Sequence, residues 1–277
     1  MERYLIAIDL DGTLLYDFDT IDESLAGFLR DFGKTGHKLV IATGRPYRSS
    51  RFIYDRFELD TPIINYNGLL VTNPKDPNFP EINFTVPKEV IIDIFQHCQE
   101  HLRNGFSEVG DHIHLLREEH AIEPLLHRAE DTVVTVGNLA ETLKEDPHGC
   151  ILIGWQGHGK AIEEYITTKY QGQVLCRIWN LSGEFDSIVE VFTPESNKGM
   201  ALEHVAKYYG FERDHIIAIG DGHNDIEMIT YAGEGIAVQN AHPELIEVAS
   251  RTLPWGPRDK AIQKYLEERF PQNEHAE

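Results

Sequence analysis

The chain has 277 residues, of which 41% are hydrophobic and 26% are charged, and its formal net charge is −21. These values are typical of a globular protein with one large domain or two smaller ones, and they argue against a disordered chain. The negative field would repel nucleic acid and anionic membrane surfaces, so we expect neither as a partner. The same field opposes an anionic substrate unless the site supplies local positive charge.

The cysteines and the N-terminus predict a cytoplasmic protein. Cys98, Cys150 and Cys176 are widely spaced and form no CxxC pair, which is typical of reduced thiols. The N-terminus has no basic segment followed by an apolar stretch and a cleavage site, so no signal peptide is expected. No apolar run approaches the roughly 18 residues that a membrane span needs.

Apolar runs and helical patterns alternate at the start of the chain. We expect strands at Tyr4–Ile8, Lys38–Ala42 and Pro62–Tyr66, and helices at Asp22–Phe32 and Pro46–Phe57. Continuous apolar strands separated by helices predict βαβ units and a parallel sheet. The expected fold class is therefore α/β, with a Rossmann-like core.

The pattern changes at about Asn83. A long helix is expected at Pro87–His101, and short strands at Asp111–Leu116 and Cys150–Trp155. We interpret residues 83–187 as an inserted α+β domain, and residues 1–82 with 188–277 as the core.

The first pattern returns from Ile188. Helices are expected at Lys198–Tyr209, Asp225–Tyr231, Pro243–Ala249 and Arg258–Arg269, and strands at Ile216–Ile219 and Gly235–Val238. The last residues of the chain are expected to be disordered.

Polar groups gather at the ends of three expected strands. They are DLDGT at Asp9–Thr13, Thr43-Gly44-Arg45, and GDGHND at Gly220–Asp225. Ligands of open parallel sheets bind at the carboxyl ends of the strands, so these loops should converge on one crevice. Lys198, at the start of an expected helix, could point into it.

These residue types suit phosphoryl transfer. Of Asp9 and Asp11, one carboxylate could attack phosphorus while the other moves protons. Asp221 and Asp225, with Asp9, would form an oxygen-rich site that favours Mg²⁺. The remaining oxygens of a phosphate could be held by polar groups of Thr43, Gly44, Lys198 and Asn224.

Each signal taken alone has a simpler interpretation, such as a strand end, a solvated lysine or a helix cap. A calcium-binding loop starting at Asp9 fails, because its sixth and twelfth positions hold Leu14 and Thr20. His112 and His114 could share a strand face as a zinc pair, but no third ligand is obvious. Arg45 could brace the phosphate loop, contact the substrate, or merely begin a helix.

The four signals together resemble the motifs of the haloacid dehalogenase (HAD) superfamily. The matching segments are DLDGT, ATG, Lys198 in NKGMAL, and GDGHNDIEMI. The finer resemblance is to its Cof-type phosphatases, which carry a large α/β (type IIB) cap between the second and third motifs. It extends to TGRP, INYNG and NAHPELIEVA, and it covers the core at both ends of the chain.

The resemblance implies a role for each matching carboxylate. Asp9 resembles the nucleophile and a metal ligand, and Asp11 the general acid/base, with its backbone carbonyl on the metal. Asp221 resembles the third protein ligand, and Asp225 an adjacent carboxylate that supports the metal site. Gly222 stands where the family often has serine.

The remaining matches imply substrate and phosphate contacts. Thr43 and Gly44 match the phosphate-binding second motif. Lys198 matches the lysine that steadies phosphate and nucleophile, and Asn224 a substrate-contacting asparagine.

We therefore predict Mg²⁺-dependent hydrolysis of a small-molecule phosphomonoester, a sugar phosphate by default, through an aspartyl-phosphate. Substrate choice is expected to reside in the inserted cap, and closure of the cap over the site is a hypothesis. Two alternatives remain open: a sugar phosphomutase and a non-catalytic protein that binds phosphorylated metabolites.

Overall fold

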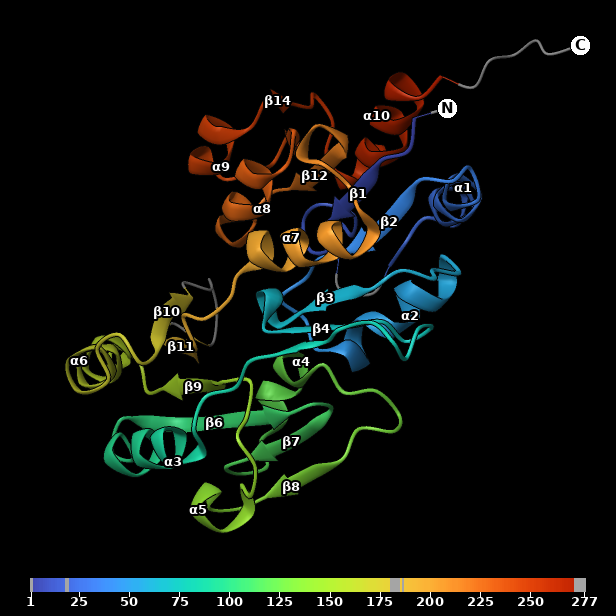
Figure 1. Ribbon diagram of the computed structural model, residues 1–277. Coiled ribbons are helices and arrows are strands. Elements are labelled where there is room, and N and C mark those ends of the chain that lie inside the picture. The colour runs from blue at the N-terminus through green and yellow to red at the C-terminus, as the bar shows by residue number, and fades with distance from the viewer. Residues whose placement is uncertain (1, 18–19, 180–184, 186, 272–277) are drawn as a thin grey trace, which may run out of the picture. The chain divides into compact units, whose positions relative to one another are not determined.

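The computed structural model describes residues 2–17, 20–179, 185 and 187–271 (Figure 1). Backbone contacts divide the chain into two compact units. The first comprises residues 1–45, 50–82 and 197–277, and the second comprises residues 46–49 and 83–196. Within the described ranges, no helix is long and apolar enough to cross a membrane.

The first unit is built on a parallel sheet of five strands in the order β14-β13-β12-β1-β2. Its strands are β1 (Leu5–Ile8), β2 (Lys38–Ile41), β12 (Ile216–Gly220), β13 (Glu234–Ala237) and β14 (Arg251–Thr252). Every residue of β1 is buried, as expected of a central strand covered on both faces. The predicted α/β class with a parallel core sheet is confirmed.

Helices cover both faces of this sheet (Figure 1). They are α1 (Glu23–Gly33), α7 (Lys198–Tyr209), α8 (Ile226–Tyr231), α9 (Pro243–Val248) and α10 (Ala261–Arg269). A further helix, α2 (Tyr47–Arg56), follows β2 along the chain. On one face, Leu5 and Ala7 of β1 share a core with Leu202 and Val205 of α7. The helix α7 begins where the Asn197 side chain accepts the amide of Met200, which fixes the position of Lys198.

The predicted strand at Pro62–Tyr66 is shorter than expected and lies largely outside this sheet. β3 (Ile63–Asn65) pairs antiparallel with β4 (Leu70–Thr72), and β5 (Ile82–Asn83) completes a small separate sheet. A single parallel bridge joins Ile64 of β3 to Ala42, just after β2. The turn between β3 and β4 is the 3₁₀ segment η1 (Tyr66–Gly68).

The second unit is a mainly antiparallel sheet of six strands in the order β10-β11-β9-β6-β7-β8. Its strands are β6 (Leu102–Val109), β7 (His112–Leu115), β8 (Val134–Val136), β9 (Cys150–Gly154), β10 (Leu175–Trp179) and β11 (Ile188–Phe192). α3 (Lys88–His97) and α6 (Gly159–Lys169) pack on one face, where Ile94 and Ile162 meet Leu152. Short helical segments η2 (His120–Ile122), α4 (Glu123–Leu126) and α5 (Leu139–Thr142) complete the unit.

Two predicted boundaries differ from the structure. Ile188 was expected to begin the return to the core, but β11 pairs with β9 and β10, so the first unit resumes at Asn197. The last helix was expected from Arg258, but Lys260 has a left-handed backbone (φ 56°) and separates the turn η5 (Pro257–Asp259) from α10. The predicted disorder at the chain end concerns residues 272–277, which lie outside the described residues.

Candidate active site

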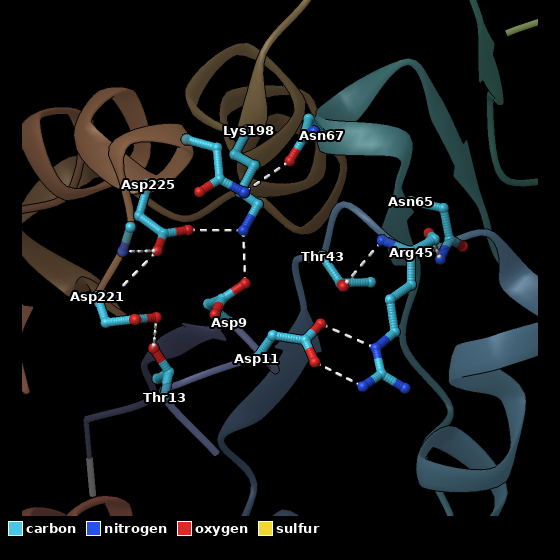
Figure 2. A network of polar contacts seen from close by, with 12 residues as sticks. Asp9, Asp11, Thr13, Thr43, Arg45, Asn65, Asn67, Lys198, Asp221 and Asp225 are labelled. Carbon is cyan, nitrogen blue, oxygen red and sulfur yellow. Dashed lines mark hydrogen bonds and ion pairs between the residues drawn. The ribbon is translucent and has the colours of Figure 1, made fainter. Parts of the chain in front are cut away.

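Three motif loops meet at one end of the core sheet, since neighbouring parallel strands end at the same edge. Asp9 follows β1, Thr43 comes after β2, and Asp221 follows β12. The amide of Asp9 donates to the carbonyl of Ile219 in β12 over 3.0 Å, which fixes Asp9 beside the neighbouring loop. Figure 2 shows the polar side chains that gather there.

Lys198 is the buried cation at the centre of the site. Its side chain has no exposed surface, and Nζ lies 2.6 Å from Oδ1 of Asp9 and 2.6 Å from Oδ1 of Asp225 (Figure 2). Burial disfavours the ammonium, but the carboxylates of Asp225 and Asp9 outweigh burial and raise the pKa of Lys198. The site thus holds a permanent positive charge inside a strongly acidic protein.

At Asp9 the surroundings favour the neutral, protonated form of the side chain. Burial, and then the charge of Asp225, raise the pKa of Asp9 well above its usual value, although Lys198 acts in the other direction. One ammonium is therefore not enough to offset the carboxylates that gather here. A further cation at this position would favour the ionised form of Asp9.

Asp225 links the lysine to the loop after β12. While its Oδ1 contacts Lys198, its Oδ2 accepts the backbone amides of Asp221 (3.0 Å) and Gly222 (2.9 Å). Both carboxylate oxygens are therefore engaged within the protein. This geometry favours a bracing role for Asp225 in the loop.

Asp221 lies at the edge of the network with one oxygen held by protein. The Thr13 hydroxyl donates to its Oδ1 over 2.8 Å. Gly12, with φ +82°, passes so close that a Cβ there would lie 2.3 Å from Oδ2 of Asp221. A side chain at Gly12 would clash, so the glycine of the DLDGT motif is required by this approach. Burial, and then Asp225, raise the pKa of Asp221 to about 6.

The carboxylates of this network fit a divalent cation. Ligand oxygens of Asp9, Asp221 and Asp225 all lie within 4.8 Å of one another. Hard oxygen donors are those that Mg²⁺ prefers. Burial, and after it the neighbouring carboxylates, raise the pKa values of Asp9 and Asp221, and a divalent ion would favour their ionised forms.

Asp11 points away from this network and forms an ion pair with Arg45 (Figure 2). Nε of Arg45 lies 2.8 Å from Oδ2 of Asp11, and Nη2 lies 2.5 Å from Oδ1. The Arg45 side chain is 3% exposed and the Asp11 side chain 50% exposed, so a buried, rigid guanidinium orients a carboxylate at the surface of the site. The interpretations left open for Arg45 did not include this contact with Asp11.

The second motif meets the fourth through Asn67, which sequence reasoning did not single out. The Asn224 amide donates to Oδ1 of Asn67 over 2.8 Å, and the Asn67 backbone amide donates to the Thr43 carbonyl over 3.0 Å. A Cβ on Gly44 would lie 3.1 Å from Oδ1 of Asn67. Thr43 is fully buried, and its Oγ1 accepts the amide of Arg45 over 3.1 Å.

The turn that carries Asn67 is left-handed over consecutive residues. Tyr66, Asn67 and Gly68 have φ values of 48°, 56° and 99°. A Cβ on Gly68 would lie 2.4 Å from the carbonyl of Asn197, the residue that caps the Lys198 helix. The Asn-Gly pair in INYNG was the sequence signal, since both residues tolerate this backbone.

The structure thus brings the expected residues together in two groups. Asp9, Asp221, Asp225 and Lys198 form one network, and Asp11 with Arg45 forms a neighbouring pair. Thr13 and Asn240 were not predicted; the Asn240 amide donates to the Gly12 carbonyl over 2.9 Å. Both lie inside motif segments, DLDGT and NAHPELIEVA, so proximity to the motifs was the available signal.

Comparison with known proteins gives the family. A model of haloacid dehalogenase-like hydrolases matches residues 6–266. The 5-amino-6-(5-phospho-D-ribitylamino)uracil phosphatase YitU of Bacillus subtilis is 35% identical over 271 residues, which cover 96% of this chain and 97% of YitU. The pyridoxal phosphate phosphatase YbhA of Escherichia coli is 26% identical, over 87% of this chain and 89% of YbhA.

A solved structure supports the same assignment at the level of the fold. The sugar phosphatase BT4131, described as HAD subclass IIB, aligns with a TM-score of 0.75 at 19% identity, covering 96% of this chain and 98% of that one. The chain belongs to the haloacid dehalogenase-like hydrolase family, and its class is that of a phosphatase. The resemblance to the Cof-type branch is confirmed.

Proposed function

We propose that this phosphatase hydrolyses a small phosphorylated metabolite with the help of Mg²⁺, through an aspartyl-phosphate on Asp9. The contact between Lys198 and Asp9 carries the proposal. A buried ammonium 2.6 Å from a buried carboxylate keeps one carboxylate oxygen oriented, and it offers a charge-assisted donor where phosphate oxygens would lie.

Asp9 and Asp221 are the residues that would hold the metal ion by their side chains, together with the backbone carbonyl of Asp11. Asp225, which has both oxygens engaged, would hold Lys198 and the Asp221 loop in place. A bound Mg²⁺ would offset the repulsion between Asp9 and the phosphate and polarise the phosphoryl group.

In the first step, the carboxylate of Asp9 attacks phosphorus and the bond to the leaving oxygen breaks. Asp11 gives its proton to that leaving oxygen, so the alcohol departs neutral. Arg45 pairs with the ionised form of Asp11, which exists after this transfer, and would orient that carboxylate for the second step. We propose that Lys198, Thr43, the Gly44 amide and Asn224 bind the phosphoryl oxygens.

In the second step, Asp11, now ionised, takes a proton from water as that water attacks phosphorus. The bond between phosphorus and the Asp9 oxygen breaks, phosphate leaves, and Asp9 returns to its starting state. Two moderate displacements replace one hydrolysis that is among the slowest known without a catalyst.

The relatives suggest where to look for the substrate. YitU is 35% identical over nearly the whole chain, and its name gives 5-amino-6-(5-phospho-D-ribitylamino)uracil as its substrate. We place that compound first, as a phosphorylated polyol chain on a ring. Pyridoxal phosphate, named for YbhA, and sugar phosphates come next. We propose that the residues of the second unit select among them.

A panel of these phosphate esters tests the proposal. We expect phosphate release with Mg²⁺, none with a chelator, and none from Asp9→Asn at any concentration of substrate. The matched control is Asp31→Asn, an exposed helix aspartate of the same unit, which should behave as the native chain. Transfer of phosphate to another position of the substrate, without release, would favour a mutase, and binding without turnover would favour a sensor.

A further inference from the structure

A second group of metal-ligating side chains lies outside the carboxylate network. His223, His242 and Glu244 are all exposed, and one ligand atom from each lies within 4.8 Å of the others. His223 begins the 3₁₀ segment η4 (His223–Asp225), whereas His242 and Glu244 lie at the start of α9. We propose that these side chains form a surface site for a borderline transition-metal ion such as Zn²⁺.

The donor set separates this site from the oxygen-rich one. Two imidazoles and a carboxylate are a combination that Zn²⁺ takes in proteins, with water completing a tetrahedral shell. Mg²⁺ prefers oxygen donors and binds imidazole poorly, so it should not compete here. Because all three side chains are exposed, an ion can reach them and keep its water ligand.

The side chains already lie together in the absence of an ion. The rings of His223 and His242 have centroids 3.8 Å apart at 40°, and Nδ1 of His223 lies 3.4 Å from a carboxylate oxygen of Glu244. Long exposed side chains that converge without a bridging ion need less ordering when the ion binds.

A backbone hydrogen bond holds η4 and the start of α9 next to each other. The amide of His242 donates to the carbonyl of Asp221 over 2.7 Å, which joins the start of α9 to the loop that carries His223. Pro243 restricts the first helical position, and Leu245 is fully buried beneath it. The ligands therefore project from an anchored turn.

One existing contact must be given up. Nδ1 of His242 accepts the amide of Glu244 over a long 3.3 Å. A metal ion on either ring nitrogen leaves Nδ1 with no lone pair for this amide. The amide lies at an exposed helix start, where water replaces the lost acceptor at little cost.

Calorimetric titration with ZnCl₂ in excess Mg²⁺, on the metal-free full chain, tests the site. On the proposed function, excess Mg²⁺ occupies the carboxylate site, so we expect one further saturable Zn²⁺ equivalent. His223→Asn and His242→Asn should each weaken it about tenfold or more, since even the loss of a residue that only orients a ligand costs about 10–100-fold. His204→Asn, which removes a histidine elsewhere in the same unit, is the matched control.

Thermal unfolding shows whether a variant loses Zn²⁺ binding only because it is destabilised. The thermal midpoint without Zn²⁺ should be the same in all variants, and Zn²⁺ should raise it less in His223→Asn and His242→Asn than in the native chain and the control. Absence of a saturable Zn²⁺ equivalent in excess Mg²⁺ would overturn the proposal, as would equal Zn²⁺ binding in native and His242→Asn proteins. Neither readout uses turnover, and the difference between the native and His242→Asn proteins does not depend on which ion the carboxylate site holds.

Discussion

Arg45 holds the carboxylate of Asp11 through two parallel contacts, with Nε 2.8 Å from Oδ2 and Nη2 2.5 Å from Oδ1. We expect Arg45→Met to lower kcat by about 10–100-fold, with a smaller change in KM, which is at or below the lower end of the ~10²–10⁴-fold that general acid–base catalysis contributes, because Arg45 only orients Asp11. Arg45→Lys should recover only part of this loss, since an ammonium cannot bind a carboxylate in two places. Steady-state kinetics on the best substrate measures both.

A change in KM alone would contradict the role of Arg45 in orienting Asp11. If Arg45 contacts the substrate instead of orienting Asp11, KM should rise while kcat is kept. Double variants separate the cases further: Arg45→Met should add little to Asp11→Asn, because both remove the same function.

Lys198 joins two buried carboxylates, so its removal should destabilise the fold as well as the site. We expect Lys198→Met to lower the free energy of unfolding at pH 8 without metal by about 3 kcal/mol, because Asp9 and Asp225 are left unpaired. The loss should shrink at pH 5, because burial raises the pKa of Asp9 and lets it bind a proton more readily. Urea unfolding at both pH values measures it.

The double variant Lys198→Met/Asp225→Asn is the control for that measurement. Removing one of the two unpaired charges should restore part of the stability at pH 8. A double variant that is less stable than Lys198→Met alone would show that packing, and not charge balance, explains the loss.

We expect metal binding to depend on pH through Asp221, which we propose as a ligand. Burial and the charge of Asp225 raise its pKa to about 6, so below pH 6 the metal-free site holds a proton that an incoming ion must displace. The apparent Mg²⁺ affinity should be nearly constant above pH 7 and fall by up to about tenfold per pH unit below pH 6, for one proton displaced. Asp9, whose pKa is also raised, should steepen the fall.

The raised pKa of Asp221 also makes the stability of the metal-free fold depend on pH. Between pH 4 and 6 the folded metal-free chain keeps a proton on Asp221 that the unfolded chain has released, so ionisation of Asp221 at higher pH destabilises the metal-free fold. Mg²⁺ should therefore raise the thermal midpoint more at pH 7.5 than at pH 5. Asp221→Asn should abolish most of this difference, and an equal Mg²⁺ effect at both pH values would contradict the assignment.

Asn67 is predicted to position Asn224. Asn67→Gly keeps the left-handed backbone but removes the acceptor of the Asn224 amide, so we expect a several-fold rise in KM with an unchanged thermal midpoint. Asn67→Ala should show the same kinetic effect and a lower thermal midpoint. The left-handed backbone costs an alanine about 1 kcal/mol, which destabilises the folded state. Additive effects of Asn67→Gly and Asn224→Ala on KM would argue against a shared role.

Local patterns predicted the core better than the second unit. The apolar run of β1 and its successors could be assigned because buried parallel strands have few other interpretations. β6 was missed because it contains Asn104-Gly105, a pair typical of turns. In the structure both lie inside the strand: Asn104 is fully buried and bonds to Arg117 and Glu119, and Gly105 leaves room for Phe95.

In the site, the sequence predicted the positions of the polar residues better than the contacts between their side chains. Motif spacing predicted which residue types stand at the strand ends, since those positions are set by the backbone. The pairing of Asp11 with Arg45, and the contact of Asn67 with Asn224, depend on side-chain directions between loops far apart in sequence. No spacing rule gives such directions, so these contacts required the structure.

The central claim is a covalent phosphoryl group on Asp9, and rapid acid quenching tests it most directly. Asp11→Asn should form the intermediate from p-nitrophenyl phosphate, whose leaving group needs no acid, and hydrolyse it slowly. Peptide mass spectrometry should then find one phosphoryl group on the peptide that contains Asp9, and none in Asp9→Asn/Asp11→Asn. A phosphoryl group on another residue, or turnover with no phosphorylated protein at any quench time, would contradict the account.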